Sequence, residues 1–130
     1  MLRLTISDSF AASHQLEHYD GDCNKLHGHT WRVAVVFRFS GKLTNGIAVD
    51  FKLLKGWLRS ELDALDHTHL NTSLAAHEAP CTDPTAEVLA QRIFFHLEAM
   101  AKSIDKFRVD SVEVWESDRA SVRFSQEANI

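Results

Sequence analysis

Three histidines near the start of the chain have the residue type and spacing of a metal site. His14 falls in a segment of alternating apolar and polar residues, and His27 and His29 flank a single glycine further along. One histidine taken alone is more often a surface residue than a ligand. Three imidazoles converging from two neighbouring strands would instead hold zinc and leave a coordination position open for water or a substrate oxygen. We therefore predict a zinc site at His14, His27 and His29.

Cys23 lies shortly before the second histidine, with Asp22, Asn24 and Lys25 as its neighbours. In a reducing compartment, a cysteine in such polar, histidine-rich surroundings is typical of a reactive or metal-binding thiol. Two roles remain open for it. As a fourth zinc ligand it would close the site, and as a thiolate base or nucleophile it would act beside the metal.

Two acidic positions are further candidates for chemistry. Asp66 precedes His67, and a carboxylate beside an imidazole can fix its tautomer and raise its basicity if the helix ends there. A helix end that favours histidine through its dipole is an equally good interpretation. Glu116 shares the strand parity of Val112 and Val114. It is therefore either an inward-facing acid that needs N–H donors from a ligand, or a solvated residue beyond the strand.

Strand periodicity is what would bring the histidines together. Residues 2–7 alternate apolar and polar, and the apolar parity continues to His14. A second alternation over 31–39 extends backwards to His29 and His27. If the two strands are neighbours, all three rings lie on one face.

The middle of the chain predicts two helices. Asp50 is placed to cap the first, which ends near Asp66, and a loop follows over 69–82. Asp83 and Pro84 then provide an N-cap and a first-turn proline for the second. The apolar stripes of the two helices are Phe51, Leu54, Leu58, Leu62 and Leu65, and Leu89, Ile93, Leu97, Met100 and Ile104.

The last third alternates again on either side of a polar turn at 117–119, which predicts two more strands. The order ββααββ then implies an α+β fold, with one antiparallel sheet covered on one face by two helices. Residues 1–130 form a single domain at this length. The two open sheet edges favour oligomerisation.

Composition excludes several classes of protein. Hydrophobic residues make up 45% and charged residues 25% of the 130 positions, as in ordinary globular domains. The net charge of -4 provides no basic field for nucleic acid. No apolar run is long enough for a membrane span or a signal peptide, so we expect a cytoplasmic protein. The two cysteines, Cys23 and Cys81, need not be paired.

Taken together, these positions resemble the 6-pyruvoyl- and 6-carboxy-tetrahydropterin synthase family. The resemblance rests on His14, Cys23, His27-Gly28-His29, Asp66-His67, Pro84-Thr85-Ala86-Glu87 and Glu116. It implies zinc at the three histidines, Cys23 as the proton-abstracting base and Asp66 with His67 as the second proton-transfer element. It also implies that Glu116 anchors a pterin and that Thr85 lies at the substrate. The family fold is the tunnelling fold, or T-fold, in which subunits join edge to edge into a barrel.

The spacing between Cys23 and His27 resembles that of the bacterial 6-carboxy-tetrahydropterin synthases of queuosine biosynthesis. That resemblance implies a zinc-dependent lyase, which converts 7,8-dihydroneopterin triphosphate to 6-carboxy-5,6,7,8-tetrahydropterin and releases triphosphate and acetaldehyde. The alternatives are a 6-pyruvoyl-tetrahydropterin synthase, which only eliminates triphosphate, and a non-catalytic zinc-bearing pterin-binding domain. The family resemblance also implies a homohexamer built as a dimer of trimers, in which Glu116 can reach the pocket from a neighbouring subunit. The remaining candidates have no assigned role: His18, His69, His77, His96 and Cys81.

Overall fold

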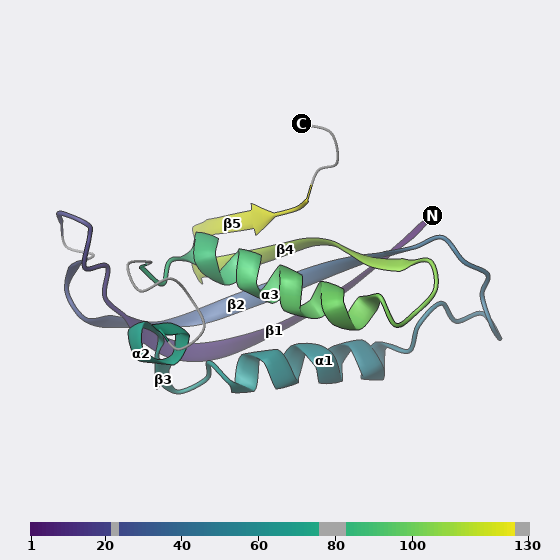
Figure 1. The fold of residues 1–130 in the computed structure, drawn as a ribbon, viewed down its shortest axis with the longest axis horizontal. Coiled ribbons are helices and arrows are strands. Elements are labelled where there is room, and N and C mark those ends of the chain that lie inside the picture. Colours follow the sequence, from purple (N-terminus) through teal and green to yellow (C-terminus); the bar gives the residue numbers. More distant parts are fainter. Residues whose placement is uncertain (22–23, 76–82, 127–130) are drawn as a thin grey trace.

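The computed structural model describes residues 1–21, 24–75 and 83–126 (Figure 1). Five strands form one sheet in the order β3-β1-β2-β4-β5, and two long helices lie side by side on one of its faces. The elements are β1 Leu2–His14, β2 His27–Phe39, α1 Phe51–Asp63, β3 Thr68–His69, α2 Leu70–Ala75, α3 Ala86–Ala101, β4 Phe107–Ser117 and β5 Ala120–Phe124. The predicted α+β class and the order of the four main strands and two main helices are confirmed. In the described ranges, no helix is both long and apolar enough to span a membrane.

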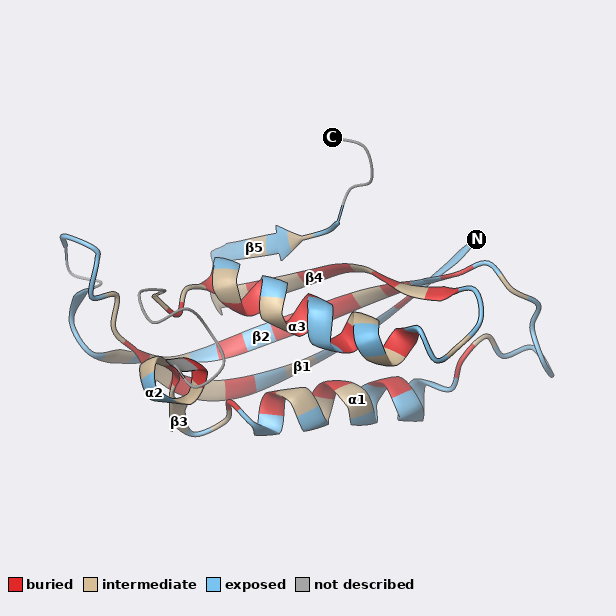
Figure 2. Ribbon diagram, in the orientation of Figure 1, coloured by how far each residue is buried: buried red, intermediate tan, exposed pale blue. Residues whose placement is uncertain are grey.

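The long antiparallel pair β1 and β2 is the centre of the sheet. Its register runs without a shift from Leu2 opposite Phe39 to His14 opposite His27. The side chains that face the helices are buried, as the alternation predicted, and Figure 2 shows these positions alternating along both strands. They are Leu4, Ile6, Phe10, Ala12 and His14 on β1 and Trp31, Val33, Val35, Phe37 and Phe39 on β2.

Helix α1 begins after Asp50, whose carboxylate accepts a hydrogen bond from the Lys52 N–H at 2.8 Å, as predicted for an N-cap. Its buried stripe is Leu54, Leu58 and Leu62. Phe51 was predicted to belong to this stripe, but it is 51% exposed. The reason is its place in the first turn. There it lines a surface groove instead of packing on the sheet.

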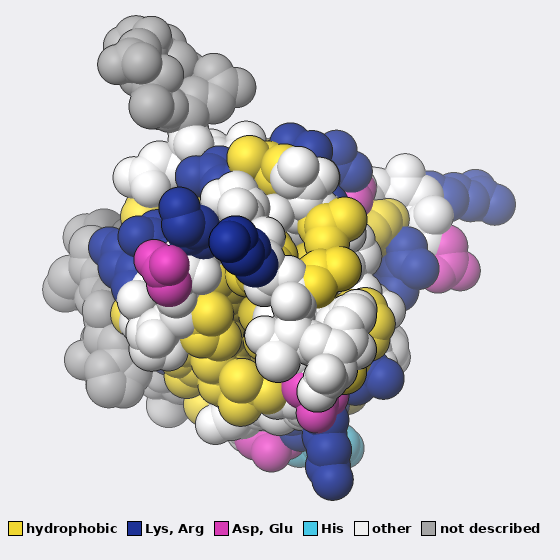
Figure 3. Space-filling model, turned by 90° about the vertical axis from the view of Figure 1, so that its right-hand side faces the viewer, with side chains coloured by type: hydrophobic (Ala, Val, Ile, Leu, Met, Phe, Trp, Pro, Cys, Tyr) yellow, Lys and Arg dark blue, Asp and Glu magenta, His cyan; other side chains and the backbone are white. Residues whose placement is uncertain are grey.

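This groove lies at the end of the molecule where α1 begins, and Figure 3 views that face with its exposed hydrophobic side chains among basic ones. It is lined by Leu2, Leu43 and Ile47 together with Phe51. The histidines are at the opposite ends of β1 and β2. The groove is therefore separate from the candidate site.

Helix α3 begins after Thr85 and not after Asp83, which corrects the predicted N-cap. The Thr85 hydroxyl accepts from the Val88 N–H at 3.2 Å. Asp83 is engaged elsewhere, because its carboxylate accepts from the backbone N–H groups of Glu17 and His18 at 3.2 and 3.0 Å. The two carboxylate oxygens of Asp83 thus bond to residues 17–18, while Thr85 caps the helix.

The segment predicted as a loop over 69–82 contains regular structure in its described part. Leu70–Ala75 forms α2, and Thr68–His69 forms β3, which pairs with β1 in parallel. The sheet is therefore mixed and not wholly antiparallel. A two-residue strand has no periodicity to detect, which is why the sequence did not indicate it.

Strand β4 changes register twice. The pairs Val36 with Ser111 and Phe37 with Val109 leave Asp110 as an extra residue. The second shift, against β5, falls between Trp115 and Ser117. A bulge inserts an unpaired residue and re-aims the neighbouring side chains, so the second one bears directly on Glu116.

The difference between Leu58 and Phe51 is testable. Leu58→Ala should lower the free energy of unfolding by about 2–5 kcal/mol, because it opens a cavity in a fully packed core. Phe51→Ala should cost about 1 kcal/mol or less, since half of that side chain already lies in water. Urea unfolding followed by tryptophan fluorescence measures both. Equal losses in the two variants would contradict the assigned helix face.

Candidate metal centre

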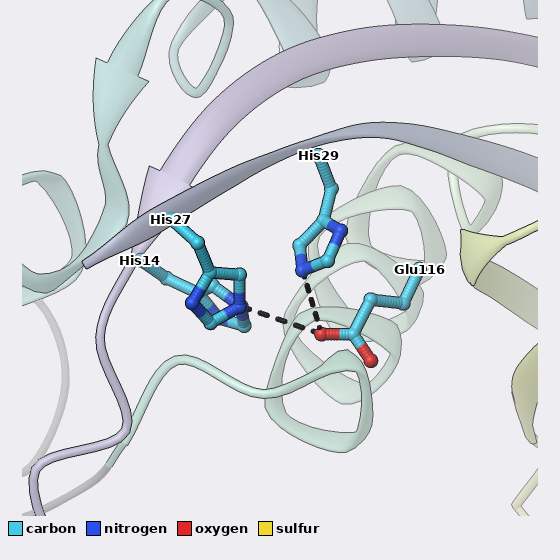
Figure 4. A group of neighbouring side chains, drawn as sticks. All are labelled: His14, His27, His29 and Glu116. Carbon is cyan, nitrogen blue, oxygen red and sulfur yellow. Dashed lines mark hydrogen bonds and ion pairs between the residues drawn. The ribbon is translucent and has the colours of Figure 1, made fainter. Parts of the chain in front are cut away.

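The three predicted histidines meet at one end of the β1–β2 pair. His14 is the last residue of β1, and His27 and His29 open β2. Their ring centroids are 4.5 to 5.1 Å apart. Figure 4 shows the three rings with the Glu116 carboxylate, and one ligand atom from each of the four residues lies within 4.8 Å of the others. The strand parity argument is confirmed for this cluster.

Backbone carbonyls fix the tautomers of two of these rings. His14 Nδ1 lies 2.8 Å from the Pro84 carbonyl oxygen, and His27 Nδ1 lies 2.6 Å from that of Lys25. A carbonyl only accepts, so each Nδ1 carries the hydrogen and each Nε2 presents its lone pair. The two Nε2 atoms are only 2.8 Å apart. In neutral rings two lone pairs at that distance repel, and a metal ion bound by both nitrogens would relieve the repulsion, so the arrangement fits a metal ion.

The rings of this cluster lie against the apolar core. The His14 side chain is 1% exposed. Trp31 packs edge-on against His14 and His29, with centroids 5.0 and 5.2 Å away. Burial lowers the pKa of His29 below its ordinary value, His14 and His27 lower it further, and Glu116 acts in the opposite direction. A neutral imidazole is the form that binds a metal.

Glu116 reaches the cluster from β4. Its Oε1 lies 3.0 Å from His29 Nε2 and 3.3 Å from His14 Nε2. The inward-facing interpretation of this residue is thus the one that fits, although the carboxylate remains partly exposed. The chain's own Glu116 occupies this place. The reach of Glu116 into the pocket of a neighbouring subunit stays a prediction.

Asp66 and His67 form a pair just beyond the end of α1 at Asp63. His67 Nδ1 lies 3.0 Å from Asp66 Oδ2, and the positive φ of 58° at His67 turns the chain sharply out of the helix. The Ala11 N–H donates to Asp66 Oδ1 at 2.9 Å. That hydrogen bond, followed by His67 and Arg59, holds the pKa of the Asp66 carboxyl below its ordinary value. The carboxylate is therefore ionised at neutral pH and orients the imidazole.

An open cleft of about 570 Å³ lies beside His67 at the edge of β1. His67 and His29 both line it, together with Thr30, Ser13 and His69. The Ser13 hydroxyl and His69 Nδ1 are hydrogen-bonded at 2.9 Å on its wall. Of the three clustered histidines, only His29 is among the described residues that line this cleft, since Ser13 and Thr30 belong to the strand face opposite the cluster.

The other candidates are distributed as follows. Cys23, His77 and Cys81 lie outside the described residues. Thr85 uses its hydroxyl oxygen in the cap of α3. His18 and His96, which had no predicted partner, are bonded to Asp83 and Glu61 at 3.0 and 2.9 Å.

Sequence reasoning missed Asn71, whose side chain bonds both backbone groups of Gln15, next to His14. It also missed the Pro84 carbonyl that orients the His14 ring. Neither contact has a sequence signal, because each joins residues far apart in the chain. The separation is 70 residues for His14 and Pro84 and 56 residues for Gln15 and Asn71.

Comparison with known proteins agrees with this arrangement. The family described as 6-pyruvoyl tetrahydropterin synthase matches residues 3–127. A Synechocystis protein named 6-carboxy-5,6,7,8-tetrahydropterin synthase is 36% identical over 122 residues, covering 89% of this chain and 87% of that protein. An Archaeoglobus fulgidus protein named as a putative synthase of the same kind is 34% identical over 105 residues, covering 80% and 83%.

Comparison with solved structures finds a similar fold. The structure of Caenorhabditis elegans 6-pyruvoyl tetrahydropterin synthase superposes with a TM-score of 0.81 at 24% identity, covering 97% of this chain and 96% of that one. The T-fold implied by the sequence resemblance is therefore confirmed. With a match that spans nearly its whole length, the chain belongs to the 6-pyruvoyl tetrahydropterin synthase family.

Proposed function

We propose that the chain is a zinc-dependent lyase that converts 7,8-dihydroneopterin triphosphate and water to 6-carboxy-5,6,7,8-tetrahydropterin, triphosphate and acetaldehyde. The observation that carries the proposal is the convergence of His14, His27 and His29 at one end of the sheet, with the Asp66–His67 pair at the neighbouring edge of β1. The names of the Synechocystis and Archaeoglobus relatives support the carboxy product. The short spacing between Cys23 and His27 supports it as well.

The metal would be held by the Nε2 atoms of His14, His27 and His29. Zinc supplies a Lewis acid that polarises the oxygens of the substrate side chain and so acidifies the adjacent C–H groups. Three nitrogen ligands leave room for those oxygens. The buried Trp31 behind the rings excludes water from the rear of the site.

Two protein groups would move the protons. Cys23, as a thiolate, removes one proton from the substrate side chain. His67 handles the other, and Asp66 holds its ring through the 3.0 Å contact at Nδ1. That contact leaves His67 Nε2 as the atom that meets the substrate. The His67 side chain is 83% exposed, so nothing in the described chain blocks its access.

Glu116 would bind the N–H donors of the pterin ring. In the structure its carboxylate contacts the Nε2 atoms of His14 and His29, which would bind the metal. A metal bound by these nitrogens would replace the carboxylate as their partner. The carboxylate could then accept hydrogen bonds from the substrate. The Thr85 oxygen is already an acceptor in the helix cap, so Thr85 would contribute its O–H as a donor.

Assembly into a homohexamer is part of the proposal. β5 is the last strand of the sheet, and β3 covers only two residues of β1. Exposed strand edges of this kind are usually paired or protected. Edge-to-edge pairing of subunits would satisfy both edges.

We also propose the cytoplasm as the compartment where the enzyme works.

Product analysis tests the function. Incubation with 7,8-dihydroneopterin triphosphate, followed by mass spectrometry, should show 6-carboxy-tetrahydropterin and acetaldehyde. The second candidate is a 6-pyruvoyl-tetrahydropterin synthase, which the C. elegans structural neighbour favours. It would give the pyruvoyl product without acetaldehyde. Binding without turnover would leave only a pterin-binding domain.

The metal ligands can be tested separately from activity. The wild-type chain should carry about one zinc per subunit, and His29→Ala should lose most of it, because two imidazoles rarely hold zinc tightly. His96→Ala is the matched control, since His96 is bonded to Glu61 far from the cluster. Elemental analysis after gel filtration measures both. Full zinc occupancy in His29→Ala would rule out the proposed site.

The role of Cys23 follows from a similar comparison. Cys23→Ala should keep zinc and fold but lose about 10²–10⁴-fold in turnover, because a base is removed while three ligands remain. Cys81→Ala should behave like the wild type in both assays. Loss of zinc together with turnover in Cys23→Ala would make the cysteine a ligand instead.

A further inference from the structure

The end of β1 that carries His14 is held along its outer edge by the segment 66–71. Asp66 accepts from the Ala11 N–H at 2.9 Å, and the His67 N–H donates to the Ala11 carbonyl at 2.6 Å. Thr68 and His69 of β3 then pair with the next two residues of β1. This ladder follows β1 up to the residue before His14.

Asn71 continues the ladder past His14. Its Oδ1 accepts from the Gln15 N–H at 2.9 Å, and its Nδ2 donates to the Gln15 carbonyl at 2.8 Å. The backbone cannot make these bonds, because α2 begins at Leu70 and turns the chain away. A side-chain amide carries the same donor and acceptor as a peptide group, so Asn71 takes the place of one more strand residue.

His14 is therefore clamped on both sides. Ser13 is paired with His69, and Gln15 is bonded to Asn71. The ring itself is held at Nδ1 by its hydrogen bond to the Pro84 carbonyl. The direction in which His14 Nε2 points therefore depends on the position of the His14 backbone.

We propose that Asn71 is a positioning residue for the metal site. It holds the backbone on the far side of His14 so that His14 Nε2 meets the nitrogens of His27 and His29. The inference rests on the proposed metal binding. It adds a residue that never touches the metal and acts through the strand that carries a ligand.

Loss of Asn71 would leave the N–H and C=O of Gln15 without these partners in a half-buried place. Such groups seek water, and the strand end would fray toward it. His14 would then sample orientations in which its Nε2 no longer faces the other two rings. Zinc affinity should fall even where the rest of the sheet stays folded.

The test measures zinc affinity in Asn71→Ala by competition with a chromophoric chelator, at a temperature where every variant is folded. Affinity should fall about 10–100-fold, the usual effect of removing a residue that orients a ligand. Thr72→Ala, an exposed change on the same helix α2, should bind zinc like the wild type. The Co²⁺ form of Asn71→Ala should also show an altered visible spectrum. If Asn71→Ala does not fold, Asn71→Ser is measured in its place.

Val49→Ala separates positioning from general stability. Val49 is buried beside the groove at the far end of the molecule. This variant should unfold at a lower temperature and still keep full zinc affinity. An equal loss of affinity in Val49→Ala would overturn the positioning role, and so would wild-type affinity in Asn71→Ala. A wild-type chain that binds no zinc would instead refute the metal part of the proposed function.

Discussion

The unshifted register between β1 and β2 is the constraint on which the rest of the structure depends. It places His14 opposite His27 at one end and Leu2 opposite Phe39 at the other. Because side chains alternate between faces, a slip of one residue would turn the apolar set of a strand away from the helices. The same slip would carry the histidines to the open face. Burial of the core therefore also fixes the positions of the three candidate metal ligands.

Core and site are also continuous in space. Trp31 is fully buried, stacks on Phe10 and donates its indole N–H to the Ala12 carbonyl at 3.2 Å. Its outer side packs against His14 and His29. The histidines thus stand where the apolar core ends, and burying polar rings there is costly unless they have partners. The Pro84 carbonyl satisfies one side of the His14 ring, and a metal would satisfy the other.

Period-two alternation was enough to predict the three histidines on one face, because parity is a local property of a strand. Glu116 was ambiguous, since parity cannot say where a strand ends or that a bulge lies beside it. The true N-cap of α3 was missed because Asp83 looks like a cap until the loop containing His18 is seen bonded to it. Contacts of Asn71 were beyond the sequence for the same reason. They join segments whose approach depends on the whole fold.

The two halves of the proposed chemistry share one stretch of backbone. Ala11 bonds to Asp66 and His67, and four residues later Gln15 bonds to Asn71, with His14 between them. A metal ligand and a proton-transfer pair mounted on separate loops would drift relative to each other, whereas these candidate groups are tied to the end of one strand and the residue after it. Catalytic groups must hold their distances within a fraction of an ångström to be effective. The ladder along the edge of β1 would supply that rigidity to the proposed site, at a sheet edge that would otherwise be unpaired.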